Sequence, residues 1–513
     1  MDIRLFWTAW MQAAVGFFVV LLGAIRSTRL VKRSVPEAPL WVEGLGAKAR
    51  RDALLIKSKS IYLESYRKFK DILGFRIPET GDSEEKLVVS PKYLDELRRF
   101  PHSVLSFEKA HSKSVDQKYT NSPPPKFFHI TPHIIKARLT PALARINRAM
   151  SAEADRAVLR ELGVCNDWTA TNVHDKMMRV IAVLSGRIFI GPELCHDERY
   201  IDAAINYTIE YSKALQDIQS LNSWLKPFVA GRLKSVVALR RREDEFVTFL
   251  TPVVQARRKA AAEGQKPPDD MLAWLMEQAV RSGVDDIQHI ALIQLALFAV
   301  AFHTTALTAT NVFYDIASRP EYVKPLREEI HQSLQEHDGL LTSAALHRLK
   351  KVDSFMKESL RFNPLSIATF QRRVLRPLTL SDGNYIPQGT ILEIANHAIS
   401  RDPAFFPDPD RFYPWRFEEL RNGDAKDARH QFASVSQMMG TFGFGPHACP
   451  GRFFAAAELK MILAWTLLRY DVRMKDGEEG YRYENLEFGL TCTPDTTRKI
   501  LFRRVSEGGP SIG

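Results

Sequence analysis

One cysteine of this chain, Cys449, lies in the segment FGFGPHACPGR at residues 442–452, which contains three glycines and two prolines. Glycine permits backbone conformations that other residues avoid, and proline fixes one backbone torsion, so the segment predicts a tightly turned loop. The apolar helical pattern FFAAAELKMILAW follows directly. Backbone N–H groups and the dipole of a helix N-terminus stabilise a thiolate. We therefore expect Cys449 to be a thiolate ligand and not a packed core cysteine.

The chain has only three further cysteines, Cys165, Cys195 and Cys492, and no CxxC pair. This spacing supports neither a disulfide framework nor a structural zinc site. Such sparse usage is typical of a protein whose bulk lies in a reducing compartment.

Residues Leu5–Ile25 contain no charged side chain and read LFWTAWMQAAVGFFVVLLGAI. A membrane-spanning helix needs roughly 20 apolar residues, whereas the apolar part of a cleavable signal has only about 7–15. The positive-inside rule places the cations that follow in the cytosol; they are Arg26, Arg29, Lys32 and Arg33. We therefore predict a membrane anchor at residues 1–33 and not a core helix.

Pro36 and Pro39 interrupt the chain after this segment, so residues 34–45 are predicted to form a hinge. Residues 46–513 are predicted to form one body without internal repeats. Its clearest helical periodicity lies at Ala142–Arg160, Asp286–Ala317 and Ala344–Phe362. Its strand signals are short and lie at Leu378–Leu380, Thr390–Ile394 and Ile500–Phe502. The pattern predicts a mainly α fold with small β-sheets.

The segment Ile290–Phe302 is apolar on every side except at Gln294. It is too short to span a bilayer and predicts a helix buried through the centre of the protein. Three polar residues follow, His303, Thr304 and Thr305. Buried polar groups are costly unless satisfied, so this cluster indicates either a functional site or hydroxyls that bond back to the preceding helical turn.

The positions of Phe442, Gly445, Cys449 and Gly451 resemble the cysteine loop FxxGxxxCxG of the cytochrome P450 family. The longer segment HACPGRFFA is similar to fungal members of specialised metabolism, and the residues HTT at 303–305 resemble those of fungal relatives of the ent-kaurene oxidase type. The resemblance implies the cytochrome P450 fold, preceded here by one transmembrane helix. It also implies haem b as the cofactor, with Cys449 as the axial thiolate ligand of the iron and the other three residues around the haem.

Two further motifs occur in the order that the resemblance implies. Glu358 and Arg361 lie three residues apart, on one face of a helix, and resemble the family's ExxR motif. Arg411, in the segment PDRF, resembles the arginine of its PERF-type segment. By resemblance these three side chains form a buried charge network that supports the haem side of the fold.

The segment VAFHTT at residues 300–305 resembles the family's central-helix pattern [AG]Gx[DE]T[TS]. The resemblance implies that Thr304 assists proton delivery during dioxygen activation and that Ala301 is the small residue that makes room. His303 stands where the family usually has an acid. A histidine with an ordinary pKa near ~6.5 can also relay protons, so His303 is a second candidate catalytic residue, with a packed core histidine or a substrate contact as the alternatives.

Haem propionates need cationic or hydrogen-bonding partners. Family matching implies His447, Lys136 and one of Arg372 or Arg373, although the segment around Lys136 lacks the tryptophan of the family's WxxxR pattern. By the same resemblance, the substrate pocket contains residues that are mostly apolar, namely Phe298, Ala301, Phe302, Leu365, Ile367 and Thr491. An apolar lining implies a bulky apolar substrate, such as a terpenoid or a related metabolite.

The resemblance implies a monooxygenase that uses O2. The sequence contains no flavin or nicotinamide fingerprint, so electrons are expected from NADPH-cytochrome P450 reductase at the endoplasmic reticulum membrane, with the catalytic body in the cytosol. Lysine and arginine number 71 against 60 acidic residues, a net charge of +11 that suits an acidic partner or an anionic membrane. No nucleic-acid-binding motif is present, and nucleic acid is not expected as a partner.

Two other functions stay open at this point. A haem-thiolate isomerase or dehydratase would form product without NADPH. A non-catalytic, membrane-anchored haem or lipid carrier would need no proton donor, and Thr304 speaks against it.

The anchor yields a first prediction. Deletion of residues 1–33 is expected to release much of the protein from membranes and to leave its haem spectrum intact, because the segment lies outside the predicted body. Fractionation of cell extracts and an absorbance spectrum measure the two effects. Loss of the haem spectrum would show instead that Leu5–Ile25 belongs to the core.

Overall fold

The computed structural model describes residues 38–41, 47–78, 85–222, 224–423, 427–475 and 481–505. The predicted anchor at residues 1–33 lies outside the described residues, as does most of the predicted hinge. Within the described part of the chain, Ile287–Ala317 is the one helix long and apolar enough to cross a membrane. About two thirds of its most apolar stretch, 67%, is buried inside the protein, as in a core helix.

The described body is mainly helical. Its helices are α2 (Ala47–Phe69), α3 (Leu94–Leu97), α4 (Phe107–Ser114), α5 (Gln117–Thr120), α6 (Phe127–Ile134), α7 (Thr140–Leu162), α8 (Val173–Phe189), α9 (Glu198–Ser220), α10 (Lys226–Val229), α11 (Lys234–Ala262), α12 (Met271–Arg281), α13 (Ile287–Ala317), α14 (Val323–Gln335), α15 (Ser343–Arg348), α16 (Lys350–Phe362), α17 (Asn396–Ile399), α18 (Arg416–Gly423) and α19 (Arg452–Arg469). The prediction of a mainly α fold is confirmed.

The strands are short and form small sheets. They are β1 (Gly74–Pro78), β2 (Glu85–Val89), β3 (Leu105–Ser106), β4 (Thr169–Asn172), β5 (Thr369–Val374), β6 (Leu378–Thr379), β7 (Tyr385–Ile386), β8 (Ile391–Ile394), β9 (Tyr470–Met474), β10 (Asn485–Phe488), β11 (Thr491–Pro494) and β12 (Lys499–Arg504). One sheet has the order β1-β2-β8-β5-β3, a second has the order β4-β12-β9, and β10-β11 and β6-β7 form two-stranded sheets. The three predicted strand segments match β6, β8 and β12.

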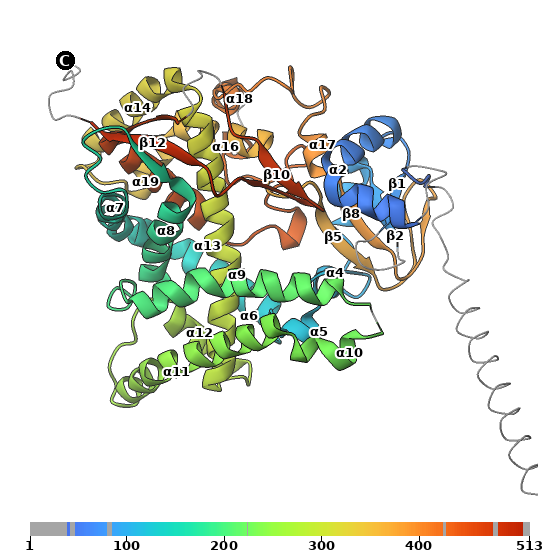
Figure 1. The fold of residues 1–513 in the computed structure, drawn as a ribbon, viewed down its shortest axis with the longest axis horizontal. Coiled ribbons are helices and arrows are strands. Elements are labelled where there is room, and N and C mark those ends of the chain that lie inside the picture. The colour runs from blue at the N-terminus through green and yellow to red at the C-terminus, as the bar shows by residue number, and fades with distance from the viewer. Residues whose placement is uncertain are drawn as a thin grey trace, which may run out of the picture.

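Helix α13 runs through the middle of the molecule, with α8, α9, α11, α16 and α19 packed around it (Figure 1). Its N-terminus is capped by Asp286, whose carboxylate accepts a hydrogen bond from the backbone N–H of His289 at 2.7 Å. The buried amide of Gln294 donates to the carbonyl of Phe189 at 2.8 Å. The predicted central helix is therefore confirmed, and its one buried polar interruption has a partner.

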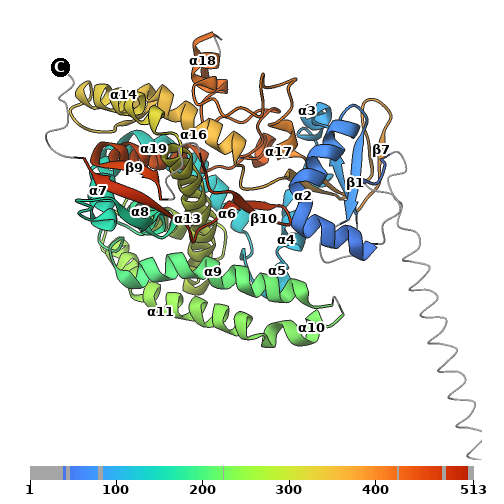
Figure 2. The same ribbon diagram turned by 45° about the horizontal axis from the view of Figure 1, so that its top comes forward.

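The body has two apolar cores, and α13 belongs to the larger one. The larger core is built from the helices α6 to α9, α11 to α16 and α19, and the smaller core packs α2 against the five-stranded sheet. Figure 2 shows that sheet on the side of the molecule opposite α7, α8 and α19.

The predicted continuous helix Ala344–Phe362 is wrong, because the segment forms two helices, α15 and α16. The chain leaves the helical conformation at Leu349, where φ is −70° and ψ is 69°. The carboxylate of Glu329 then accepts hydrogen bonds from the backbone N–H groups of Lys351 and Val352, at 2.7 and 2.9 Å. These groups begin a new helix and lack helical partners, so a distant carboxylate stabilises the break.

A buried charge network joins α16 to the chain that leads to α18. Glu358 and Arg361 are both 0% exposed, and the guanidinium of Arg361 donates twice to the carboxylate, from Nε and Nη2, at 2.8 Å each. Arg416 donates from Nε to the same carboxylate at 3.3 Å, and the backbone N–H of Tyr413 donates at 2.9 Å. The pair predicted from the ExxR motif therefore exists, and its third member is Arg416.

The assignment of Arg411 to this network is wrong. Its side chain is exposed and packs over the ring of Tyr413, with the guanidinium carbon 5.7 Å from the ring centre. Only its backbone carbonyl takes part, accepting hydrogen bonds from Arg361 and Arg416 at 3.3 and 3.2 Å. The segment contains two candidate arginines, in DRF at 410–412 and in WRF at 415–417. Helix α18 begins at the second of these, Arg416, whose side chain is buried against Glu358.

The two arginines form a matched pair for a test. Arg416→Met is expected to lower the free energy of unfolding by about 3–5 kcal/mol and to reduce haem incorporation, because it leaves the Glu358 carboxylate short of a buried partner. Arg411→Met is expected to change that free energy by roughly 0.5 kcal/mol or less, as for an exposed side chain. Denaturant titration of both variants measures the difference. Equal effects would contradict the network that the structure places around Glu358.

Candidate functional site

The loop around Cys449 is closed by its own backbone. The N–H of Cys449 donates to the carbonyl of Phe442 at 2.7 Å, and the N–H of Ala448 donates to the carbonyl of Gly445 at 3.0 Å. Gly445 has φ of +70°, and a Cβ there would lie 2.9 Å from the Cβ of Arg98. A side chain is therefore excluded at Gly445 both by conformation and by space. Gly451 has an ordinary φ of −83° and open space around it, so no described contact requires a glycine there.

The surroundings of the Cys449 thiol act on its pKa in two opposite directions. Burial raises the pKa of the thiol, whereas the backbone N–H groups of Gly451 and Arg452 and the charge of Arg452 lower it. Helix α19 begins at Arg452, so the sulfur lies at the positive end of an 18-residue helix. The Arg452 guanidinium also donates to the Cys449 carbonyl at 2.8 Å and holds the loop against the helix. This geometry is suited to a thiolate ligand.

One face of α13 is open in its middle part. Val300 is 54% exposed and Thr304 is exposed, although both lie deep inside a helix that is otherwise largely buried. The Thr304 hydroxyl donates to the Val300 carbonyl at 2.9 Å. Residues four apart lie on the same helix face, so the two side chains border one space. Ala301 is half-buried beside it. Helix α13 also packs against α19, the helix that follows the cysteine loop.

The prediction that Phe298 and Phe302 line the substrate pocket is wrong. Both side chains are 0% exposed, and their rings stack on each other and on Phe189 with ring centres 5.3–6.3 Å apart. At about 100° per residue, Phe302 lies on the opposite side of the helix from Val300 and Thr304. Both residues are part of the larger core.

His303 lies on the flank of α13 that packs on α9. Its Nε2 is 3.1 Å from the carbonyl oxygen of Ile205, which makes Nε2 the protonated nitrogen. Burial lowers the pKa of His303, and the hydrogen bond to the carbonyl acts in the opposite direction. No hydrogen bond joins His303 to Thr304 in the part of the chain that the structure describes. The geometry favours a helix-to-helix contact.

The remaining predicted pocket residues come from two segments that lie side by side. The backbone N–H of Cys492 donates to the carbonyl of Leu365 at 3.1 Å, and the N–H of Ile367 donates to the carbonyl of Leu490 at 2.9 Å. Leu365 is half-buried and Thr491 is exposed, as a pocket wall requires. Ile367 is 0% exposed and packs in the smaller core, so its assignment to the pocket surface is wrong.

Arg372 and Arg373 lie on opposite faces of β5, because successive side chains alternate along a strand. Arg372 is 5% exposed, and its guanidinium packs over the rings of Phe370 and Phe107, at 4.3 and 5.5 Å from the ring centres. Phe370 has φ of +59°, and the pairing of β5 with β8 shifts register between residues 369 and 372. Such irregularities re-aim side chains, here toward the cysteine loop. Arg373 is half-buried on the other face.

Arg372 is a buried cation without an acidic partner. It donates to the carbonyls of Gln371 and Phe444, at 2.8 and 3.5 Å, and burial lowers its pKa to about 10. Among the described residues, no carboxylate lies within ion-pair distance of its guanidinium. A charge left in this state is costly unless an anion from outside the chain completes it.

Two further basic residues, His447 and Lys136, lie near Arg372. Burial, followed by the charges of Arg372, His102 and Lys136, lowers the pKa of His447 to about 4. A neutral imidazole can donate one hydrogen bond to an acceptor. The ring of His447 lies 4.4 Å from that of His102, and the Lys136 ammonium is 3.4 Å from the carbonyl of Pro446.

These residues fit a haem. The thiolate position at Cys449 matches the iron of the group, and the basic residues around Arg372, which has no carboxylate partner among the described residues, match its propionates. Sequence reasoning missed Arg98, His102 and Phe107, which bring the cysteine loop, β5 and α4 together. Nothing in the segment RRFPHSVLSF at residues 98–107 signals this role, since it arises only when the chain folds back on the loop.

Comparisons with known proteins match this chain to one family. The family model of cytochrome P450 matches residues 136–500. Cytochrome P450 monooxygenase ATR3 of Stachybotrys chlorohalonatus is 37% identical over 439 residues, which cover 83% of this chain and 90% of that protein. Cytochrome P450 monooxygenase braC of Annulohypoxylon truncatum is 32% identical over 453 residues, covering 88% and 89%. Cytochrome P450 monooxygenase paxP of Penicillium paxilli is 34% identical over 457 residues, covering 87% and 85%.

Because Arg372 has no acidic partner among the described residues, its replacement is expected to affect the stability of the apoprotein and its affinity for haem in opposite ways. Arg372→Met is expected to leave the thermal stability of the apoprotein unchanged or raised, because it removes a buried charge, and to weaken haem binding roughly ten- to hundred-fold, as expected for a lost charged hydrogen bond. Arg373→Met, on the other strand face, is the matched control and should alter haem binding little. Thermal melts and haem titration measure both effects. Unchanged haem affinity in Arg372→Met would contradict the assignment.

Proposed function

This chain belongs to the cytochrome P450 family, and on that basis we propose that it is a monooxygenase that oxidises an apolar specialised metabolite of terpenoid or related skeleton. Electrons come from NADPH-cytochrome P450 reductase. The observation that carries the proposal is the combination of a thiolate position at a helix N-terminus with a buried cation, Arg372, that has no acidic partner.

The family's cofactor is haem b with an axial cysteine thiolate, and Cys449 is the ligand here. Arg372, His447 and Lys136 would hold its propionates, as charge-bearing or hydrogen-bonding donors beside the cysteine loop. When bound, the haem supplies the electron-rich iron that activates dioxygen for insertion into a C–H bond. The protein positions the substrate and manages protons.

Thr304 is the residue placed to handle protons. Its hydroxyl lies on the open face of α13, and it donates to the carbonyl of Val300 in its present rotamer. Rotation about one side-chain bond turns the same hydroxyl toward the open space. In our proposal, His303 can relay protons to Thr304 only if the His303 ring leaves the carbonyl of Ile205. His303 is therefore the weaker candidate.

The residues that border the open space support an apolar substrate. Val300 and Ala301 present aliphatic groups on the open face of α13, and we place Leu365 and Thr491, which lie on neighbouring segments, at its edge. Sites with this composition bind bulky apolar molecules and orient them with few polar contacts.

The anchor and the reductase complete the proposal. Residues 1–33 hold the enzyme in the endoplasmic reticulum membrane, with the body in the cytosol. The net charge of +11 favours association with an acidic reductase and with anionic lipid.

The ligand assignment has a direct test. Cys449→Ser is expected to abolish the red-shifted absorbance band of the reduced, CO-treated protein, because a serine hydroxyl does not provide the thiolate. Cys492→Ser, a buried cysteine outside the loop, is the control and should retain the band. Survival of the band in Cys449→Ser would contradict the assignment. Product formation by the unmodified protein without NADPH would identify an isomerase or dehydratase instead.

The proton path has a second test. Thr304→Ala is expected to retain the haem and to divert much of the NADPH consumption into hydrogen peroxide, since the hydroxyl nearest the open space is lost. Product formed per NADPH consumed measures this coupling. In His303→Leu, near-normal coupling indicates the helix contact to Ile205, and strong uncoupling indicates the relay. Near-normal coupling in Thr304→Ala would contradict its role.

A further inference from the structure

The face of α13 that carries Thr304 continues toward the end of the helix as a buried polar network. At about 100° per residue, Asn311 and Asp315 lie within roughly 20° of Thr304 around the helix axis. Thr304 is exposed, whereas Asn311 and Asp315 are 2% and 0% exposed. Other parts of the chain therefore cover this face between residues 304 and 315, and they determine where the open space ends.

The Asp315 carboxylate binds both segments that cover the face. One oxygen accepts hydrogen bonds from the Ser359 hydroxyl at 2.5 Å and from the Asn363 amide at 3.1 Å, at the start of the segment 363–367. The other oxygen accepts from Nε of Arg482 at 2.7 Å, just before the β10–β11 hairpin. One carboxylate thus fixes two segments to the central helix.

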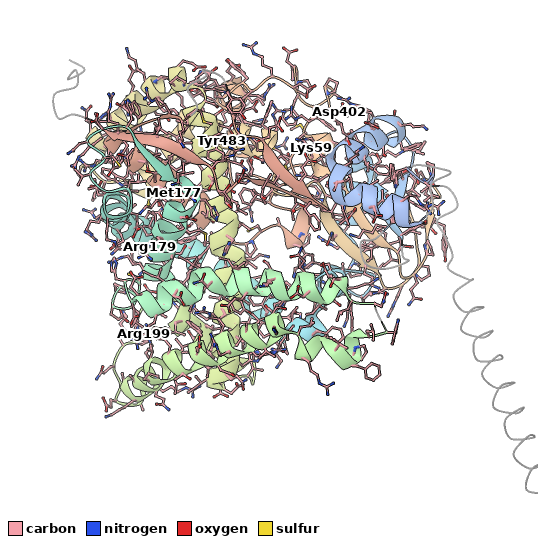
Figure 3. The ribbon with its side chains drawn as sticks, in the orientation of Figure 1. Lys59, Met177, Arg179, Arg199, Asp402 and Tyr483 are labelled. Carbon is pink, nitrogen blue, oxygen red and sulfur yellow. The ribbon has the colours of Figure 1, made fainter. Side chains whose placement is uncertain are left out.

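Arg482 connects α13 to the stem of the hairpin. Its Nη2 donates to the Asn311 side-chain oxygen at 2.6 Å, and its Nη1 donates to the carbonyl of Tyr483 and to the Asn485 side-chain oxygen, at 2.6 and 3.1 Å. Its side chain is only 12% exposed. Figure 3 shows Tyr483 beside α13, where the hairpin begins.

The far end of the hairpin is held by α2. The Lys59 ammonium lies 3.3 Å from the Glu487 carboxylate, and the N–H of Gly489 donates to the carbonyl of Leu55 at 2.9 Å. Lys59 lies on α2, across from Tyr483 (Figure 3). The hairpin therefore spans from the central helix to the smaller core, and it carries Thr491 alongside the segment with Leu365.

We propose that the Asp315–Arg482 pair is a positioning device that sets the hairpin and the segment 363–367 relative to Thr304, and so determines how large a ligand the open space accepts. Arg482 is a positioning residue, since it lies behind the hairpin stem and acts through it. The inference rests on the proposed function, because the space becomes a substrate pocket only with haem bound at Cys449.

Arg319 provides a matched control. It also donates to the Asp315 carboxylate, at 3.1 Å, but its other contacts are Ser318, its own helix and the ring of Phe412. Replacement of Arg319 thus removes an ion pair from the same carboxylate and leaves the hairpin untouched. Replacement of Arg482 removes the link to the hairpin.

The experiment compares Arg482→Gln and Arg319→Gln in the full-length, haem-loaded protein by spectral titration with two iron-binding azoles, imidazole and clotrimazole. Arg482→Gln is expected to change the clotrimazole dissociation constant by about five-fold or more and the imidazole constant by less than about two-fold, the range for residues that act indirectly. Arg319→Gln should leave the ratio of the two constants unchanged. Arg482→Lys retains the charge and is expected to give an intermediate ratio.

A ratio equal to that of the unmodified protein in both Arg482 variants would overturn the proposal, as would equal shifts in Arg482→Gln and Arg319→Gln. Hydrogen exchange at residues 485–494 needs no haem and is expected to accelerate in the Arg482 variants alone. Unchanged exchange there would overturn the positioning role even if haem binding failed. The CO spectrum of the unmodified protein reports separately on the proposed function.

Discussion

Glu358 and Arg361 are completely removed from water, and a buried charge is tolerated only when hydrogen bonds replace its lost hydration. The replacement here comes from distant parts of the chain, namely Arg416, the N–H of Tyr413 and carbonyls near Ser400. Ser400 and Tyr413 belong to the irregular chain between α17 and α18, and Arg416 is the first residue of α18. The network fixes the course of that chain against α16.

On the haem side of the protein, in contrast, a buried charge lacks a partner of opposite charge within the described chain. Glu358 has every partner it needs within the chain, whereas Arg372 has carbonyls and aromatic rings but no acid among the described residues. Cys449 likewise has N–H donors and a nearby guanidinium that favour its charged form against the effect of burial. The Cys449 thiolate position is suited to binding a metal, and Arg372 has no anionic partner among the described residues. One cofactor that carries both a metal and acidic groups accounts for both.

Different faces of the central helix α13 have different roles. Phe298 and Phe302 stack in the core on one side, His303 contacts α9 on the flank, and Thr304 borders the open space. Along that last face the helix passes from an open region to the buried Asp315 network. Helical geometry alone produces this division, because residues four and eleven positions apart return to nearly the same direction. The catalytic and positioning groups thus share one rigid element.

The sequence by itself determined the mainly α fold, the central helix, the cysteine loop and the pair Glu358–Arg361. Each depends on residues close together in the chain, where glycine and proline conformations, hydrophobic periodicity and helical spacing act locally. Tertiary structure decided the rest. Arg416 and not Arg411 completes the network, Phe298 and Ile367 face the core, and Glu329 divides a predicted helix in two. Nothing in the sequence around Arg482 predicted that it would link α13 to the β10–β11 hairpin. In each of these cases the deciding partner lies far away in the chain, and neither composition nor spacing specifies which buried group a side chain will meet.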